Sequence, residues 1–220
     1  MNLETDDLIE RLATRHKPIR RLPPPRKRTL HWLSIALCGV AAVVALMSPR
    51  DDLAAKLTDN RFLVEEMAAL ATAVAAAFSA FCLIIPGQSR AVALLPAPPL
   101  ALWLGSLGQG CWQAWLRYGQ EAWRLSPDWV CLPAIAIVGA IPALTMVAML
   151  QKGAPIAPRM TVMLGALAAA ALGNVGLRLF HPQDASLMVL VWQFGSVALL
   201  SLLAGWGGRQ ILAWRHLGNA

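Results

Sequence analysis

The residues best suited to chemistry in this chain are its cysteines and histidines. They are Cys38, Cys82, Cys111, Cys131, His16, His31, His181 and His216. Their spacing matches no zinc, haem or redox motif, and the chain contains no GxSxG, HExxH or phosphate-loop pattern. Four cysteines in 220 residues are also too few for a disulfide-stabilised scaffold. The pattern therefore predicts a protein that is not an enzyme and that has no cofactor.

Long apolar stretches are the elements that must position these residues. The chain is 57% hydrophobic and 14% charged, whereas soluble domains carry roughly 25% charged residues. A helix needs about 20 mostly apolar residues to cross a bilayer, and its backbone groups are then satisfied internally. Six stretches meet this requirement: 30–47, 67–85, 91–107, 130–150, 160–177 and 187–206. The sequence predicts an all-α, polytopic membrane protein with six transmembrane helices.

The distribution of basic residues predicts the orientation in the membrane. If the N-terminus lies inside, 13 of the 19 Lys and Arg residues fall on the inner side. By the positive-inside rule, both termini are then cytoplasmic. The predicted organisation is an N-terminal segment over 1–29, a transmembrane domain over 30–206 and a C-terminal tail over 207–220.

Prolines and small residues indicate how the spans are built. Pro96, Pro98 and Pro99 predict that the third span is kinked or begins late. The small residues of 68–77 and 165–176 predict close helix packing. No span carries a charged residue near its centre, which favours a packed bundle over a substrate path.

The N-terminal segment carries one short amphipathic helix. Leu8, Ile9 and Leu12 form its apolar stripe. A lone helix of about twelve residues is only marginally stable in water, so we expect a partner protein or the lipid surface to order it. Three prolines at 23–25 then form a stiff spacer. The basic residues 26–28 are expected to fix the orientation and to contact anionic lipid.

In their order and spacing, several motifs resemble one known family. They are DDLIERLA, PIRRLPPP, GAPIAPRM, HPQD and LVWQFGSVALLSLLAGWGGRQILAW. Together with the six spans, they resemble the NrsF-type membrane anti-sigma factors, and the resemblance covers almost the whole chain. It implies a bacterial inner-membrane regulator whose N-terminal segment holds an extracytoplasmic-function sigma factor, with no direct contact to nucleic acid. A small transporter or permease subunit is the alternative. The implied partner-binding residues are Asp6, Asp7, Leu8, Ile9, Arg11 and Leu12.

The same resemblance implies a stress sensor on the outer face. Two cysteines are typical there, and Cys131 matches the first of them. His181 stands where the second would be, so the family's expected pair is replaced. A Cys111–Cys131 disulfide and a soft metal ion bound by Cys131 and His181 both remain open. Either would make an oxidant or a heavy metal the signal.

Overall fold

In the part of the chain that the computed structural model describes, every regular element is a helix. That part comprises residues 3–14, 22–119, 131–153, 155–181, 191 and 194–212. The regular elements there are α1 (Leu3–Thr14), α2 (Pro25–Met47), α3 (Leu53–Lys56), α4 (Asn60–Leu83), η1 (Arg90–Leu94), α5 (Ala97–Tyr118), α6 (Cys131–Leu150), α7 (Pro158–Phe180), α9 (Gly195–Trp206) and α10 (Gly208–Ile211). The predicted all-α fold class is confirmed.

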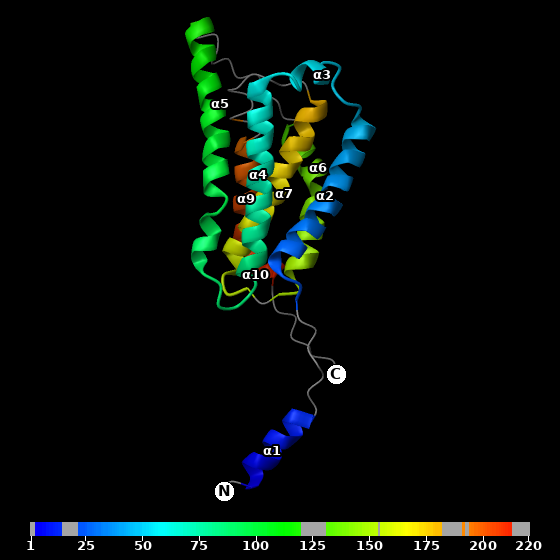
Figure 1. Ribbon diagram of the computed structural model, residues 1–220, viewed down its shortest axis with the longest axis vertical. Helices are drawn as coiled ribbons and strands as arrows, with labels where there is room; N and C mark the ends of the chain where they lie inside the picture. The colour runs from blue at the N-terminus through cyan, green and yellow to red at the C-terminus, as the bar shows by residue number, and fades with distance from the viewer. Residues whose placement is uncertain are drawn as a thin grey trace.

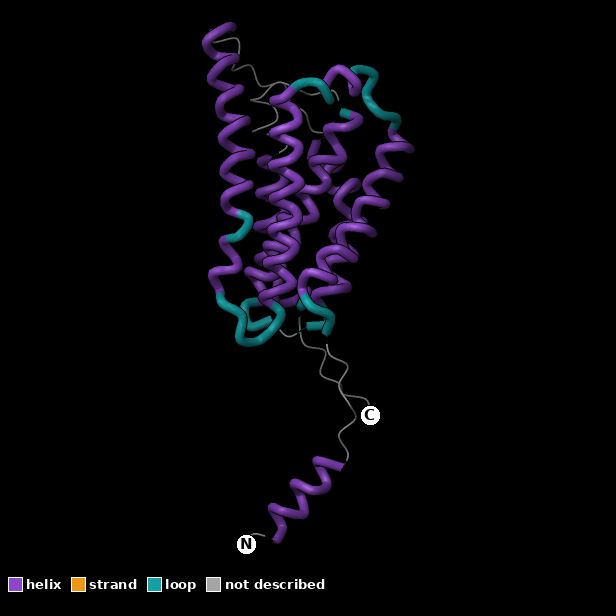
Figure 2. Tube along the Cα trace, in the orientation of Figure 1, coloured by secondary structure: helices purple, strands orange, loops and turns teal. Residues whose placement is uncertain are grey.

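Helices α2, α4, α5, α6, α7 and α9 pack together into a bundle, and α1 stands apart from it (Figure 1). Among the described connections, those on either side of α4 lie at opposite ends of the bundle (Figure 2). We call the end where α2 begins the terminal end, because α1 and α10 also lie toward it. The opposite end, where α3 lies, is called the distal end.

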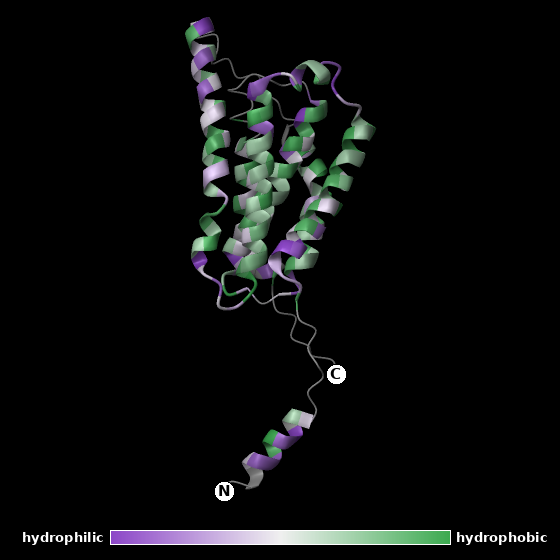
Figure 3. Ribbon diagram, viewed as in Figure 1, coloured by the Kyte–Doolittle hydropathy of each residue, from purple (hydrophilic) through white to green (hydrophobic). Residues whose placement is uncertain are grey.

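Among the described residues, five helices are long and apolar enough to cross a membrane. They cover Pro25–Met47, Asn60–Leu83, Arg90–Tyr118, Pro133–Leu150 and Pro158–Phe180. Apolar residues dominate the middle of the bundle, and hydrophilic ones gather toward its ends (Figure 3). The predicted sixth span, 187–206, lies partly outside the described residues; its described part contains α9, a 12-residue apolar helix.

Helix α7 occupies the centre of the bundle and packs against α2, α4, α6 and α9. A Cβ atom at Gly173 would lie 3.0 Å from the carbonyl oxygen of Ile135 and 3.2 Å from the Cα atom of Gly139. The backbones of α6 and α7 therefore approach each other where both carry glycine, as small residues allow. The close packing predicted for 165–176 is confirmed.

The third span begins late, as its prolines predict. Residues Arg90–Leu94 form a short 3-10 helix, and α5 starts after Pro96. It then continues to Tyr118, so the expected end of this span at 107 is wrong. Cys111 consequently lies within a helix and not in a connecting loop.

Several helices extend beyond their apolar stretches and carry charged residues into the bundle. Helix α2 begins at Pro25, α4 begins at Asn60 and α7 ends at Phe180. Arg28, Glu65, Glu66 and Arg178 are buried as a result. Arg28, which is expected to fix the orientation and contact anionic lipid, is buried here, and its guanidinium contacts the Met149 carbonyl and the Phe81 ring.

Candidate functional site

The helix α1 presents its apolar stripe uncovered. Leu8 is 56% exposed and Ile9 is 59% exposed. The Asp7 carboxylate lies 2.8 Å from the Arg11 guanidinium one turn later, a spacing that supports an isolated helix by a few tenths of a kcal/mol. Leu12 belongs to the helix, although its side chain lies outside the described residues. The predicted binding residues thus share one helix with an exposed apolar face and charged flanks.

At the distal end, four charged side chains form what we call the distal ion network: Arg61, Glu65, Glu66 and Arg178. Glu65 is its centre. Arg61 Nε donates to Glu65 Oε1 at 2.9 Å, and Arg178 Nη1 donates to Glu65 Oε2 at 2.7 Å. Glu65 and Arg178 are each 3% exposed. The carboxylate of Glu65 therefore joins α4 to α7 through a buried ion pair.

Glu66 is a second carboxylate facing the same guanidinium. Arg178 Nε lies 3.2 Å from Glu66 Oε1, which is ion-pair distance without hydrogen-bond geometry. Neither carboxylate oxygen of Glu66 has a hydrogen-bond partner within the described part of the chain. The Arg178 guanidinium also lies over the Phe62 ring, 4.8 Å from its centroid. One cation thus serves two buried carboxylates and an aromatic ring.

The network also reaches α5 through Arg61. A Cβ atom at Gly110 would lie 1.4 Å from Arg61 Nη2, so the guanidinium fills the space that glycine leaves open. The next residue is Cys111, a half-buried free thiol. A side chain at position 110 would displace Arg61, and this contact therefore couples α4 to the helix that carries Cys111.

The predicted sensor residues all belong to the distal end. Cys131 is the first residue of α6, but its side chain lies outside the described residues. His181 terminates α7, where its backbone N–H donates to the Leu177 carbonyl at 2.8 Å, and Arg178 precedes it by three residues. Cys111 and His181 thus flank the distal ion network. Within the described residues, no three His, Cys, Asp or Glu side chains are grouped to hold a metal ion.

Sequence reasoning did not find the distal ion network. Its residues lie just beyond apolar stretches, and hydropathy assigns such positions to the connections. The missed signal was the placement of Glu65, Glu66 and Arg178 at the same end of two adjacent spans. Opposite charges at equal depth can pair, and paired charges are tolerated inside helical membrane bundles.

Fold and site together define a polytopic helical membrane protein with a detached amphipathic N-terminal helix. The sequence model of one family, "NrsF: Negative regulator of sigma F", matches residues 12–214. The chain belongs to this NrsF family, and negative regulation of a sigma factor is the function that the family description gives. No curated protein and no solved structure matches the chain. The family match begins at Leu12, so residues 6–11 of α1 precede it.

Proposed function

We propose that this chain is an inner-membrane anti-sigma factor that sequesters an extracytoplasmic-function sigma factor. The helix α1 binds the sigma factor, and an oxidant or a heavy metal at the outer face causes its release. The protein acts by binding, without catalysis. The observation that carries the proposal is the exposed apolar face of α1 in a chain of the NrsF family.

The stripe on α1 is suited to a groove on a partner protein. An amphipathic helix binds such a groove through apolar residues spaced one turn apart, and Leu8 and Leu12 have this spacing. Covering one leucine or isoleucine side chain contributes about 1.5–3 kcal/mol. Asp6, Asp7 and Arg11 border the stripe, where charged residues tune specificity more than affinity.

The proposed orientation follows from the lysine and arginine distribution. It places the terminal end and α1 in the cytoplasm, where a sigma factor is found. The distal end then faces the periplasm, which is oxidising and permits cysteine oxidation. Cys131, Cys111 and His181 would all lie at this outer end.

Transmission of the signal would use α6 and α2. Helix α6 begins at Cys131 and ends near the start of α2. Trp32 Nε1 of α2 donates to the Pro142 carbonyl at 2.9 Å, and Arg28 Nη2 donates to the Met149 carbonyl. Pro142 lacks a backbone N–H, which weakens α6 at that turn. A shift of α6 would therefore move the first turns of α2, from which the tether to α1 extends.

The experiment is a transcriptional reporter of the target sigma factor, with the full chain expressed in bacteria. Changing Leu8→Asp together with Leu12→Asp should raise reporter output to the level seen without the regulator. Thr14→Asp is the matched control, because it adds a carboxylate on the helix face away from the stripe. This control should repress normally.

Deletion of residues 1–14 distinguishes the proposal from the transporter alternative. A regulator that binds through α1 loses repression, whereas a transporter would keep its activity without the tail. Immunodetection in the membrane fraction checks that each variant inserts. Full repression by the inserted Leu8→Asp, Leu12→Asp variant would refute the assignment of α1 as the binding element.

A further inference from the structure

A buried arginine at the terminal end has one unused donor group. Arg28 is 4% exposed. Its Nη2 donates to the Met149 carbonyl at the C-terminal end of α6, and its guanidinium lies 4.6 Å from the centroid of the Phe81 ring. Its Nη1 has no hydrogen-bond partner within the described residues. A buried donor without an acceptor is costly, so an acceptor bound beside this guanidinium would stabilise it.

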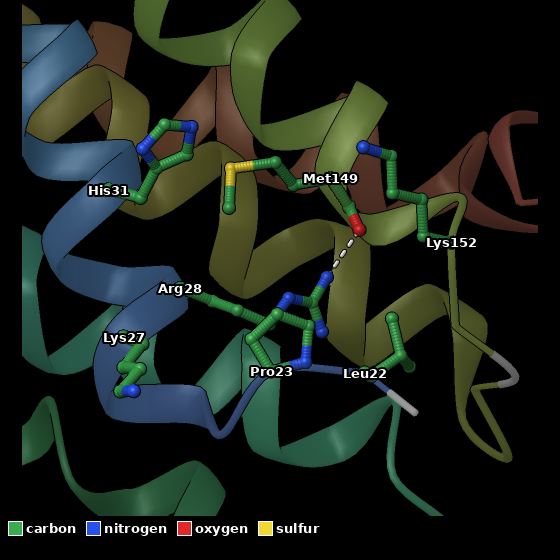
Figure 4. A pocket seen from close by; sticks show the side chains of 7 residues that line it. All are labelled: Leu22, Pro23, Lys27, Arg28, His31, Met149 and Lys152. Carbon is green, nitrogen blue, oxygen red and sulfur yellow. Dashed lines mark hydrogen bonds between the residues drawn. The ribbon is translucent and has the colours of Figure 1, made fainter. Parts of the chain in front are cut away.

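The same guanidinium lines a cavity of about 360 Å³ between α2 and the end of α6. Figure 4 shows Arg28 extending from α2 across this space toward the Met149 carbonyl. The other lining residues are three apolar ones, two lysines and a histidine: Leu22, Pro23, Met149, Lys27, Lys152 and His31. The lining thus combines three cationic residues with an apolar wall, and in Figure 4 the ammonium groups of Lys27 and Lys152 point away from the Arg28 guanidinium.

Among the described residues, the cations around this cavity differ from those at the distal end in lacking carboxylate partners. Within the described part of the chain, Lys27, Arg28 and Lys152 form no ion pair with Asp or Glu. The distal end differs, because two carboxylates face the buried Arg178 there. Three unneutralised cations around one cavity are suited to an anion with several oxygen atoms.

We propose that this cavity binds a phosphate group, presented either by an anionic phospholipid or by a soluble phosphate. A phosphate offers several acceptor oxygens, which suit the Arg28 guanidinium and the ammonium groups that the flexible Lys27 and Lys152 side chains can bring over the cavity. The cavity lies at the end of the transmembrane helices, at the depth of lipid head groups. Leu22, Pro23 and Met149 provide apolar contacts that suit the glycerol and upper acyl carbons of a lipid.

The site also lies where the tether enters the bundle. Leu22 and Pro23 lie just before Pro24, the N-cap of α2, and both line the cavity. A bound phosphate would therefore hold the start of α2 and the end of α6 together through Arg28 and Lys152. This site is separate from the binding face of α1, and its test does not require a sigma factor.

Thermal unfolding of the full chain in an uncharged detergent tests the proposal. The protein is titrated with phosphatidylglycerol, with phosphatidylcholine, or with sodium phosphate balanced against sodium chloride. A ligand that binds only the folded state raises the Tm. We expect phosphatidylglycerol to raise the Tm and phosphatidylcholine to leave it unchanged. The positively charged choline group of phosphatidylcholine would be repelled by Lys27 and Lys152.

Two exposed lysines supply variants that should fold normally. Lys152→Gln and Lys27→Gln should each raise the half-saturating phosphatidylglycerol concentration about fivefold, since one basic residue near an anionic surface contributes about 1 kcal/mol. Arg28→Gln should abolish the effect. The matched control is Arg26→Gln, which removes one charge from the same turn of α2 but lies outside the cavity lining.

The outcomes separate the two sources and the alternative of general surface attraction. A Tm increase with phosphatidylglycerol alone supports a lipid occupant, and an equal increase with sodium phosphate supports a soluble one. Three results would overturn the site: no increase with either anion, an equal increase with phosphatidylcholine, or equal losses for Arg26→Gln and Lys152→Gln.

Discussion

Replacing Arg178 should be the most costly single change in the distal ion network. Arg178→Gln removes the only described cation that contacts both Glu65 and Glu66. Both carboxylates would remain buried without it. Removing one partner of a buried ion pair typically costs about 3–5 kcal/mol, and we expect Arg178→Gln to lower the free energy of unfolding by that amount.

The geometry also predicts an order among the other members of the network. Glu65→Gln leaves Arg178 with Glu66, so its cost should be smaller than that of Arg178→Gln. Arg61 is the mildest position, because its side chain is 38% exposed while it pairs with Glu65. Exposed pairs contribute about 0.2–1 kcal/mol, and Arg61→Gln should fall in that range. Arg61→Gln is thus a suitable control, because Arg61 and Arg178 both donate to Glu65.

The assay is reversible unfolding of the full chain in mixed micelles of an uncharged detergent and dodecyl sulfate, followed by circular dichroism. The double variant Glu65→Gln, Arg178→Gln should recover part of the Arg178→Gln loss, since one uncompensated carboxylate is removed. If Arg61→Gln and Arg178→Gln lowered the free energy of unfolding equally, the burial of Arg178 would not explain how much its ion pairs contribute to stability. Additive losses in the double variant would show that Glu65 and Arg178 are not coupled.

Three further predictions concern the bundle and the sensor. Gly173→Val should destabilise the protein by several kcal/mol, because the valine side chain would collide with the α6 backbone. The control Gly105→Ala should be tolerated in the same unfolding assay, because no atom lies within 4 Å of the added Cβ. Trp32→Phe removes the hydrogen bond to the Pro142 carbonyl, so stability should fall by about 1 kcal/mol and reporter induction by the outer signal should weaken. Cys131→Ser should abolish reporter induction by oxidant and cadmium, and a response equal to that of the parent would exclude thiol sensing by this residue.

Apolar length was sufficient to predict the helical membrane fold. Long uncharged stretches admit few other structures, because backbone groups in lipid must be paired within each segment. The late start of α5 could also be predicted from Pro96, Pro98 and Pro99. A proline inside a helix removes one backbone hydrogen bond, and its ring clashes with the preceding turn. Small residues likewise predicted close packing over 165–176, but not that α6 would be the partner at Gly173.

Helix ends were predicted poorly wherever a charged residue has a partner on another helix. A hydropathy profile places the ends of the spans at Arg28, Glu65 and Arg178. The profile includes the free-energy cost of burying each charge, but not the stabilisation that a partner on another helix provides. The partners of these residues are distant in sequence: Met149 for Arg28, and Glu65 for Arg178. Such contacts follow from the three-dimensional arrangement of helices, which no local pattern in this chain specifies.

The central claim is that α1 holds a sigma factor through its apolar stripe, and site-specific photo-crosslinking in living cells tests it most directly. A photoreactive residue is placed at position 8 on the stripe, or at position 10 on the opposite face. Crosslinked products are then identified by mass spectrometry. The account predicts a sigma factor crosslinked from position 8, with little product from position 10 and none when Leu12→Asp is also present. Equal crosslinking from both positions, or no sigma factor crosslinked from position 8, would contradict it.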